Sequence, residues 1–402
     1  MELPRTTDME VAGKRVLVRA DLNVPIEDGR ITDATRIERF AHGMRPLLDK
    51  GARLVILTHY GRPDPNERNP GFSVDKLRPA LSEALGTRVD FSDVCIGRSA
   101  RILSEKVQPG EALLCENLRY NAGETANDPD FAAGLAGLGD IYVNDAFSCA
   151  HRAHASTEAL AHLLPAAAGP LMLEEIEALT SALENPASPS VAVVGGSKVS
   201  TKIAVLRNLV AKIDHLIVGG GMANTFLFAE GAPMGRSLHE ADQLDMVAEI
   251  RRAADAAGCQ LHIPVDAVAA AEFASDTSQV VCDAHACPED MMMLDAGPKA
   301  LAAFETLVAE ARTVLWNGPL GAFELSPFDH ATLALARAVA QRTQAGAVTS
   351  VAGGGDTVAA LNAAGVVDDF TYVSSAGGAF LEWLEGRTLP GITALKKGAQ
   401  HG

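Results

Sequence analysis

The stretch Val191-Ala-Val-Val194-Gly195-Gly-Ser-Lys198-Val-Ser-Thr-Lys202 joins a short β-branched run directly to a glycine turn that carries two lysines. A short apolar run bounded by turn residues is typical of a buried strand. A glycine turn that opens a helix presents free main-chain amides to an anion. The stretch therefore predicts one strand and helix of a parallel α/β sheet, with a phosphate site at their junction. Its spacing is not that of a P-loop, G-x-x-x-x-G-K-[ST].

The same alternation extends in both directions along the chain. Short apolar runs alternate with longer stretches of helical periodicity, which is the pattern of a parallel, doubly wound sheet. Strands are expected at 16–19, 54–58, 112–115 and 141–144, and again at 191–194, 215–218, 260–264, 313–316, 348–351 and 371–374. We therefore predict an α/β protein with two doubly wound, Rossmann-like parallel-sheet domains.

A helix followed by a proline-bounded loop lies between the two sets of strands. Apolar residues recur at helical spacing over 171–184, and Asn185-Pro-Ala-Ser-Pro189 ends the pattern. We expect a first domain at 1–170, an interdomain helix hinge at 171–186 and a second domain at 187–389, with a cleft between the two domains. The alternative is an ordinary crossover helix within one large domain.

Composition restricts the classes of partner. The 402 residues include 34 Lys and Arg against 51 Asp and Glu, and 48% are hydrophobic. Such a chain can bury a core, and its net charge of −17 repels nucleic acid and anionic lipid. Six cysteines are too few for a disulfide scaffold, and no secretory signal or membrane span is recognisable. We expect a cytoplasmic protein with no nucleic-acid or membrane partner.

The acidity is unevenly distributed. Residues 1–170 hold 20 Lys and Arg against 24 Asp and Glu, whereas residues 171–402 hold 14 against 27. The first half is nearly balanced and supplies most of the arginines. An anionic ligand on the second half would depend on main-chain amides, lysines and a metal ion.

Arginine and histidine follow four of the expected strands in the first half. The carboxyl ends of parallel strands meet at one edge of a sheet, so these side chains are expected to converge. Guanidinium groups bind phosphate and carboxylate bidentately, which suits a small ligand that carries both groups. Any one arginine is more often a surface ion-pair partner. The candidate residues are Asp21, Asn23, Arg36, His59, Arg62, Arg119 and Arg152.

No general base is assigned in this half. His59, His151 and His154 could each accept a proton, but a histidine in an anion pocket more often donates a hydrogen bond.

Further glycine turns follow strands of the second half, at 219–224, 317–321, 353–357 and 376–378. Each alone is more often a tight turn, but four at the strand ends of one domain favour a nucleotide cradle. Asp356 could hold Mg²⁺, or it could cap a helix. Glu324 could accept ribose hydroxyls, or it could be a solvated loop acid. Trp316 is expected in the core.

One short segment could suggest a metal site. Cys282-Asp-Ala-His285-Ala-Cys287 has potential ligands but lacks the two-residue cysteine spacing and a second pair, so a surface loop is expected there.

Taken in order, these motifs resemble phosphoglycerate kinase, and the resemblance extends through nearly the whole chain. The motifs are RADLNVP (19–25), HYGRP (59–63), ENLR (116–119), DAFSCAHRAHAS (145–156), GGSKVSTKI (195–203), GGGMANTFL (219–227), GPK (297–299), WNGPLGAFE (316–324), GGGDT (353–357) and the segment 375–391. The chain departs from the family pattern at Ala20, Leu22, Ser148, Cys149, Ser197, Ala300 and Ala376. None of these departures removes a charged ligand contact, although Ala376 is next to the expected phosphoryl path.

The resemblance implies a two-lobed kinase, with 3-phosphoglycerate or 1,3-bisphosphoglycerate on the first domain and Mg-ADP or Mg-ATP on the second. The seven residues named above would bind the phosphoglycerate. Arg36, Lys198, Gly377 and Gly378 would stabilise the transferring group. The nucleotide would be bound by Lys202, Gly297, Glu324, Gly353, Gly354, Gly355, Asp356 and Thr357, with Asp356 near the metal. The resemblance also implies a monomer whose last residues, about 390–402, pack on the first domain.

Two alternatives remain. A dinucleotide-dependent oxidoreductase would also be doubly wound, but it should show one complete G-x-G-x-x-G fingerprint, which this chain lacks. A non-catalytic scaffold on the same fold should have lost the charged site residues, and all of them are present. The kinase interpretation needs no general base, because the acceptor is a carboxylate that is already ionised at neutral pH.

Overall fold

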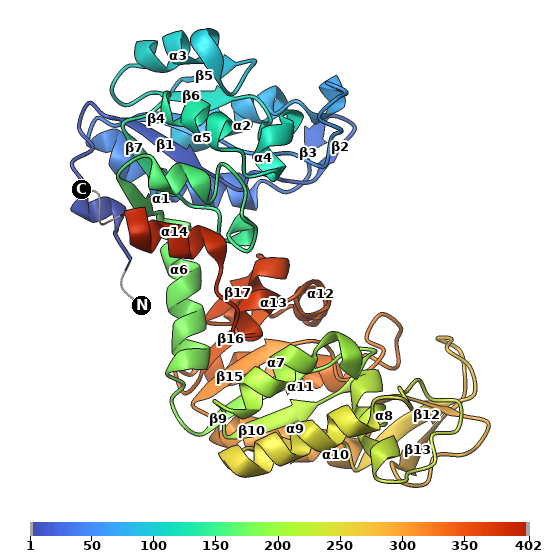
Figure 1. The fold of residues 1–402 in the computed structure, drawn as a ribbon. Coiled ribbons are helices and arrows are strands. Elements are labelled where there is room, and N and C mark those ends of the chain that lie inside the picture. Colours follow the sequence, from blue (N-terminus) through green and yellow to red (C-terminus); the bar gives the residue numbers. More distant parts are fainter. Residues whose placement is uncertain (1–2, 399–402) are drawn as a thin grey trace. The chain divides into compact units, whose positions relative to one another are not determined.

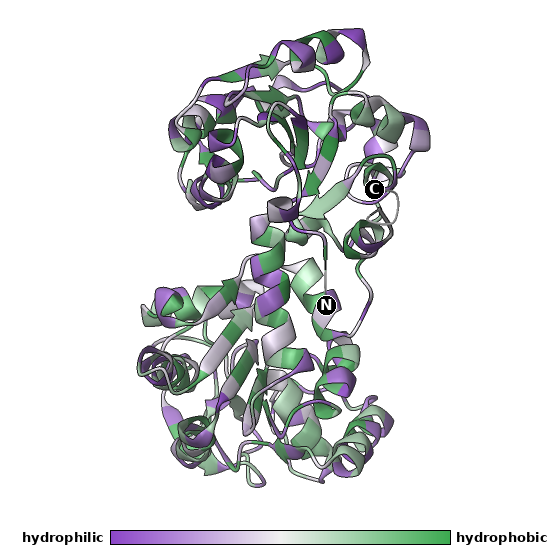
Figure 2. Ribbon diagram, turned by 90° about the vertical axis from the view of Figure 1, so that its left-hand side faces the viewer, coloured by the Kyte–Doolittle hydropathy of each residue, from purple (hydrophilic) through white to green (hydrophobic). Residues whose placement is uncertain are grey.

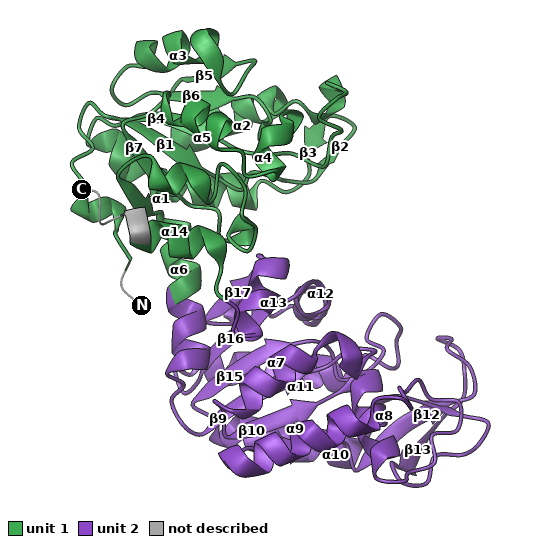
Figure 3. Ribbon diagram, viewed as in Figure 1, with its two compact units in different colours: residues 1–176, 388–402 green, residues 177–387 purple. Residues whose placement is uncertain are grey.

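The computed structural model describes residues 3–398. Its contacts divide the chain into two compact units, Met1–Ile176 with Thr388–Gly402, and Glu177–Arg387 (Figure 3). The sequence position of this division lies within helix α6 (Pro170–Leu179), which continues into a π-helical segment, η7 (Thr180–Glu184). The expected helix over 171–184 is thus present. The end of the expected tail, residues 399–402, lies outside the described residues.

Unit 1 is built on a six-stranded parallel sheet with the order β5-β6-β4-β1-β7-β8 (Figure 1). After β1 the chain adds β4, β5 and β6 on one side of β1, and it then adds β7 and β8 on the other side. The topological switch point therefore lies between β1 and β7. The strands are β1 (Arg15–Arg19), β4 (Arg53–Leu57), β5 (Val89–Ser92), β6 (Ala112–Cys115), β7 (Ile141–Asn144) and β8 (Ala166–Ala168), with a small hairpin of β2 (Ile26–Glu27) and β3 (Arg30–Ile31).

Alternating strand residues and two amphipathic helices form a core on one face of this sheet. Val16 and Val18 of β1 pack in one cluster with Phe40 and Met44 of α1 and Leu81 of α2. In the hydropathy colouring the strands are mainly hydrophobic and the helices are mixed (Figure 2). The helices are α1 (Thr35–Asp49), α2 (Arg78–Leu85), α3 (Gly97–Lys106), α4 (Ala122–Thr125), α5 (Pro129–Ala136), α6 and α14 (Pro390–Gly398).

Unit 2 contains a second six-stranded parallel sheet with the order β11-β10-β9-β15-β16-β17. In chain order this is 3-2-1-4-5-6, the doubly wound arrangement whose switch point lies between β9 and β15. The strands are β9 (Ser190–Val194), β10 (His215–Val218), β11 (Gln260–His262), β15 (Thr313–Asn317), β16 (Thr349–Gly353) and β17 (Tyr372–Ser374). The predicted fold class is confirmed.

Helices α10 and α11 cover one face of the second sheet. Phe304 of α10 and Leu335 of α11 share a core with Val191, Val314 and Trp316, so Trp316 is a core residue as expected. The helices of unit 2 are α7 (Ile203–Val210), α8 (Gly220–Ala229), α9 (Leu244–Ala257), α10 (Pro298–Glu310), α11 (His330–Gln344), α12 (Gly355–Ala364) and α13 (Gly378–Leu384).

The structure contains strands that the sequence pattern did not predict. An antiparallel sheet of the order β13-β12-β14 comprises β12 (Asp266–Ala270), β13 (Gln279–Asp283) and β14 (Met292–Ala296). The loop expected at residues 282–287 is wrong for Cys282, which belongs to β13. The parallel strands β5 and β8 were also missed. β8 is three alanines, which have low strand propensity and are strand only because β7 pairs with them.

Candidate functional sites

The candidate residues of unit 1 gather at the carboxyl ends of four neighbouring strands. Asp21 and Asn23 follow β1, His59 and Arg62 follow β4, Arg119 follows β6 and Arg152 follows β7. These strands are adjacent in the order β6-β4-β1-β7, so the topology brings together side chains that are more than 100 residues apart in sequence. Arg36 is in the first turn of α1.

Asp21 is the acceptor at the centre of this group. Its Oδ2 accepts a hydrogen bond from Arg36 Nη1 at 2.7 Å and another from Ser148 Oγ at 2.5 Å. Burial opposes ionisation of Asp21, but the charge of Arg36 and the hydrogen bond from Ser148 outweigh it, so the pKa of this carboxyl lies below its ordinary value. Asn23 Oδ1 accepts the N–H of Gly61 at 3.0 Å, which ties the loop after β1 to the loop after β4.

Three arginines around the site carry positive charge without a carboxylate partner. Among the described residues, Arg62, Arg119 and Arg152 form no ion pair; Arg119 donates to the carbonyl of Gly61 at 2.5 Å, and Arg152 to His151 Nε2 at 3.1 Å. Burial lowers the pKa of Arg119, and the guanidinium groups of Arg19 and Arg152 lower it further. Mutually repelling cations gathered at the ends of parallel strands produce a positive potential that attracts anions.

Two histidines of this site, His59 and His154, are neutral at physiological pH. Burial and neighbouring arginines lower the pKa of His59 to about 2 and that of His154 to about 4. A neutral imidazole can donate a hydrogen bond to an anion through its protonated ring nitrogen.

Unit 2 contains a cavity of about 410 Å³ at the ends of β9, β10 and β15. Polar residues of its lining include Ser197, Glu324 and Asp356, together with the glycine turns. The remainder is mostly apolar and includes Leu227, Leu238 and the strand segment 292–294 of β14. Its volume and its mixture of apolar walls and a few polar groups suit a nucleotide-sized ligand.

The turns after β9 and β15 touch each other at the switch point. A Cβ added to Gly195 would meet the carbonyl oxygen of Pro319 at 1.7 Å, and one added to Gly318 would meet that of Gly195 at 2.2 Å. Both positions therefore require glycine because two backbones cross there. These glycines shape the cradle.

Lys202 contacts the two turns at this crossing. Its Nζ donates to the carbonyl oxygens of Gly195 at 2.7 Å and Asn317 at 2.9 Å. Burial lowers the pKa of Lys202 to about 8, and the negative charge of Asp356 opposes that shift. A desolvated ammonium beside a cavity is suited to an incoming phosphate.

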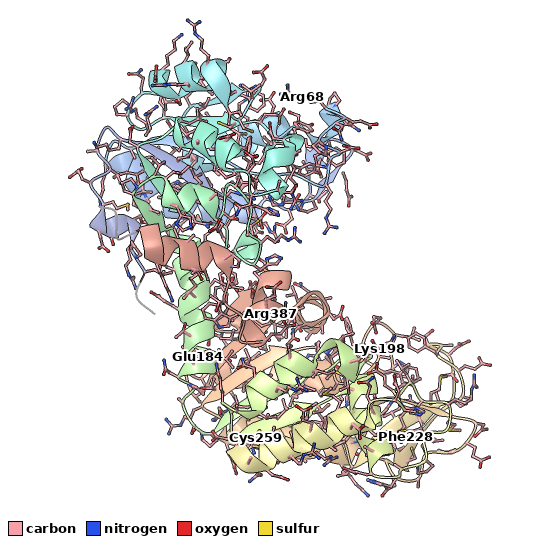
Figure 4. The ribbon with its side chains drawn as sticks, in the orientation of Figure 1. Arg68, Glu184, Lys198, Phe228, Cys259 and Arg387 are labelled. Carbon is pink, nitrogen blue, oxygen red and sulfur yellow. The ribbon has the colours of Figure 1, made fainter. Side chains whose placement is uncertain are left out.

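Lys198 is exposed on the loop after β9 (Figure 4). The four-residue spacing of Lys198 and Lys202 in the sequence predicts that both lie on one face of the first helical turns, and this prediction is wrong. Lys198 is extended before a 3₁₀ turn, η8 (Val199–Thr201), and α7 begins only at Ile203. The two lysines consequently occupy different environments, one exposed and one largely buried.

The other predicted nucleotide residues divide into two groups. Glu324 and Asp356 line the cavity; Asp356 is exposed in the first turn of α12, after the N-cap Gly354, so the alternative that it caps the helix is wrong. The remaining predicted residues do not line the cavity. Thr357 Oγ1 accepts the N–H of Gly318 at 2.8 Å, and Gly353 lies against the Phe380 ring. Gly297 caps α10 beside the Asp266 carboxylate, and Gly355 begins α12.

Gly377 and Gly378 form the turn before α13, with Gly377 in the left-handed region at φ 54°. Among the described residues, the main-chain N–H groups of Gly377 and Gly378 have no hydrogen-bond acceptor. They are therefore available to an anion, as the resemblance implies.

Sequence reasoning missed several residues that the structure brings to these sites. Ser148 holds Asp21, Arg19 contacts His59, and Asn224 and Asp295 line the cavity. Ser148 was recognisable only as a departure from the family pattern. Burial raises the pKa of Asp295 to about 7, although its carboxylate accepts the N–H of Ala331 at 2.9 Å.

Two doubly wound units, one with an arginine-rich anion site and one with a glycine-lined cavity and two lysines, define a kinase of small phosphorylated metabolites. Comparison with known proteins identifies the family. The family model described as phosphoglycerate kinase matches residues 6–387. The chain belongs to the phosphoglycerate kinase family, and it is a phosphotransferase that uses a carboxyl group as acceptor.

Named relatives and solved structures agree. The chain is 56% identical over 388 residues to the phosphoglycerate kinase of Ruegeria pomeroyi, covering 96% of this chain and 97% of the relative, and 55% identical over 388 residues to that of Rhizobium meliloti, again covering 96% and 97%. The structure of phosphoglycerate kinase from Coxiella burnetii superposes with a TM-score of 0.93 at 43% identity, covering 99% of this chain and 100% of that one. Nothing in these comparisons supports the oxidoreductase alternative.

Within residues 3–398, no group of three or more His, Cys, Asp or Glu side chains is placed to hold a metal ion, and no helix is both long and apolar enough to cross a membrane.

Proposed function

We propose that unit 1 binds 3-phosphoglycerate or 1,3-bisphosphoglycerate and that unit 2 binds ADP or ATP. The observation that carries this assignment is the set of three arginines without carboxylate partners, Arg62, Arg119 and Arg152, at adjacent strand ends of unit 1. A phosphate and a carboxylate on one small acid would neutralise them. The nucleotide-sized cavity of unit 2 supports the other half of the assignment.

In unit 1, Asp21 and Asn23 accept hydrogen bonds from the hydroxyl of the acid, and neutral His59 donates one to an oxygen of the ligand. Arg62, Arg119 and Arg152 bind the phosphate. Arg36 forms an ion pair with Asp21 at 2.7 Å, and in this proposal it turns from Asp21 to the group being transferred.

In unit 2, we assign the phosphates to Lys202 and to the turn from Gly353 to Thr357, which reaches the cavity through Asp356. Glu324 accepts the ribose hydroxyls, and the nucleoside lies near Gly297, which follows the cavity-lining Ala296. Asp356 fits a magnesium ion, because Mg²⁺ in nucleotide enzymes is bound by one or two carboxylates together with substrate phosphates. The lack of a denser acidic cluster among the described residues is consistent with an ion that arrives with the nucleotide. When bound, Mg²⁺ would neutralise charge on the phosphates.

Phosphoryl transfer here requires positioning and charge stabilisation rather than a base. The acceptor is an ionised carboxylate, and charge develops on the equatorial oxygens of the moving phosphoryl group. Arg36, Lys198 and the amides of Gly377 and Gly378 stabilise that charge. Arg36 and Lys198 belong to different units, so we propose that segment 171–186 acts as a hinge and that both substrates together drive closure.

A coupled assay of ATP-dependent 3-phosphoglycerate phosphorylation tests the function. Activity should require Mg²⁺ and be lost with EDTA. Separate calorimetric titrations of each ligand test the division between units: Arg119→Met should weaken 3-phosphoglycerate binding and leave ADP binding unchanged. Loss of ADP affinity in that variant, or no loss of 3-phosphoglycerate affinity, would contradict the assignment. For closure, solution scattering should show compaction only with both ligands present.

We also propose that the enzyme acts in the cytoplasm as a monomer. All six cysteines are free thiols in the structure, which suits a reducing compartment. The monomer rests on the family resemblance, and sedimentation at enzyme concentrations used in the assay tests it.

A further inference from the structure

Arg19 ends strand β1 at the edge of the anion site, yet its guanidinium is engaged by the protein. The residue is 1% exposed. Its Nε donates to Ser156 Oγ at 2.9 Å, its Nη1 donates to the carbonyl of Ala20, and its Nη2 contacts Cys149 Sγ at 3.4 Å. A side chain with so many donors in use and almost no accessible surface is not available to bind the substrate directly.

The remaining contact of Arg19 is with a histidine. Arg19 Nη2 lies 3.0 Å from His59 Nδ1. A guanidinium has only donors and does not lose its proton in proteins, so Nδ1 must be the acceptor in this hydrogen bond. A neutral imidazole that accepts at Nδ1 carries its proton on Nε2.

From this contact we propose that Arg19 is a positioning residue that holds His59 in the tautomer with the proton on Nε2, so that His59 donates a hydrogen bond to the phosphorylated acid. The inference rests on the proposed assignment of that substrate to unit 1. An oxygen anion requires a donor, and the opposite tautomer would present a lone pair to it and repel it.

A buried network fixes Arg19 in turn. Ser156 Oγ donates to Glu124 Oε1 at 2.6 Å, and Ser156 N–H donates to Glu124 Oε2 at 3.0 Å. Glu124 is 1% exposed, and its charge compensates the buried guanidinium. The chain Glu124–Ser156–Arg19–His59 therefore links α4, the loop after β7, β1 and the loop after β4.

The charged groups facing His59 also keep it neutral. Arg19, Arg119 and Arg152 disfavour the imidazolium, whereas Asp21 favours it, and burial disfavours any charge there. With Arg19 in place the three cations and burial prevail. The donor on Nε2 is then independent of pH across the physiological range.

The tautomer can be measured directly in the unmodified protein. In long-range ¹H–¹⁵N spectra of histidine-labelled enzyme, with His59 identified by its loss in His59→Gln, Nδ1 should have the shift of an unprotonated nitrogen and Nε2 that of a protonated one, from about pH 5 to 8. A proton on Nδ1, or titration of His59 within that range, would overturn the proposal. This result does not depend on catalytic activity, so it is separable from failure of the proposed function.

Two variants test the part played by Arg19. Arg19→Lys keeps a side chain that can donate but cannot accept a hydrogen bond. His59 in this variant should therefore keep its proton on Nε2. Arg19→Met removes both donor and charge, so His59 should titrate nearer its ordinary pKa of about 6.5. At pH 5.5, His59 of Arg19→Met should be protonated and should attract the anion. The Kd for 3-phosphoglycerate of Arg19→Met, divided by that of the wild type, should therefore be several-fold smaller at pH 5.5 than at pH 8.

Arg98→Met, an exposed substitution on α3, is the matched control, and its ratio of Kd values to the wild type should not change with pH. A folded Arg19→Met enzyme with the wild-type tautomer and a flat ratio would contradict the proposal. If Arg19→Met does not fold, the spectra of the wild type and of Arg19→Lys decide the question.

Discussion

Ser148 Oγ donates a hydrogen bond of 2.5 Å to the same carboxylate oxygen of Asp21 that Arg36 occupies at 2.7 Å. Two donors from elements more than 100 residues apart thus share Oδ2 of Asp21, whereas Oδ1 accepts the main-chain N–H of Asn23 at 3.3 Å. If Arg36 leaves Asp21 during the reaction, Ser148 remains as a donor.

Removing this hydroxyl should weaken substrate binding modestly. Ser148→Ala should raise KM for 3-phosphoglycerate about threefold to tenfold with little change in KM for ATP, since one hydrogen bond is worth about 1 kcal/mol and Arg36 still holds Asp21. Ser148→Thr keeps the hydroxyl and should behave as the wild type. A double-mutant cycle with Asp21→Asn should show the loss to be non-additive; additive effects would place Ser148 outside this contact.

Lys198 should act on turnover. Lys198→Ala should lower kcat by about 10²–10³ with a modest change in KM, because its charge is needed chiefly when the phosphoryl group moves. The control is Lys106→Ala, which changes an exposed lysine at the end of α3 and should leave kcat unchanged. An unchanged kcat in Lys198→Ala would remove its assigned role.

Nucleotide binding should weaken as pH rises through the pKa of Lys202. Burial lowers this pKa to about 8, so the ammonium is charged below that pH and neutral above it. ATP affinity measured by calorimetry should therefore fall between about pH 7 and 9. Lys202→Met should bind weakly throughout and lose this slope. If ATP affinity still falls with pH in Lys202→Met, a group other than Lys202 is responsible for the pH dependence.

Asp145 should make stability depend on pH. Its Oδ1 accepts the N–H groups of Leu171 at 2.8 Å and Met172 at 3.3 Å, but its buried Oδ2 has no partner among the described residues. Burial raises the pKa of Asp145 from 3.8 to about 7. The folded state therefore binds this proton more tightly than the unfolded state, and the stability that it contributes is lost as pH rises from about 4 through 7.

Asp145→Asn removes that titration. Relative to the wild type, the variant should gain on the order of 1–3 kcal/mol in free energy of unfolding on going from pH 5 to pH 8. Denaturant unfolding followed by circular dichroism measures it, with Glu83→Gln, an exposed change on α2, as the control. The expectation fails if the difference between Asp145→Asn and the wild type is the same at both pH values.

The glycines of unit 2 should differ sharply in their tolerance of alanine. Gly195→Ala would place a Cβ 1.7 Å from the carbonyl oxygen of Pro319, whereas a Cβ at Gly355 meets nothing within 4 Å. Gly195→Ala should therefore lower the unfolding temperature and abolish ADP binding, while Gly355→Ala should fold as the wild type. Thermal unfolding with and without ADP distinguishes them, and an unperturbed Gly195→Ala would show that the crossing is not tight.

The sequence pattern located the strands that carry the sites because these strands are continuous apolar runs that end in polar or glycine residues. The expected ranges 112–115, 141–144 and 215–218 coincide with β6, β7 and β10. Missed strands are of a different kind. β8 consists of alanines, and β13 is an edge strand with Val280 and Val281 exposed, so neither shows the period of a buried strand.

Residue type and position by themselves determined the family, the α/β class and the convergence of arginines, because parallel strands place whatever follows them at a common edge. Only the tertiary structure decided how each polar group is used. Arg19 and Arg119 are alike in sequence, each ending or following a strand, yet Arg19 is buried against Ser156 and His59, whereas Arg119 is half-buried and donates to the carbonyl of Gly61. The physical reason is that hydrogen-bond partners and desolvation depend on neighbours that come from distant segments, and local periodicity carries no record of them.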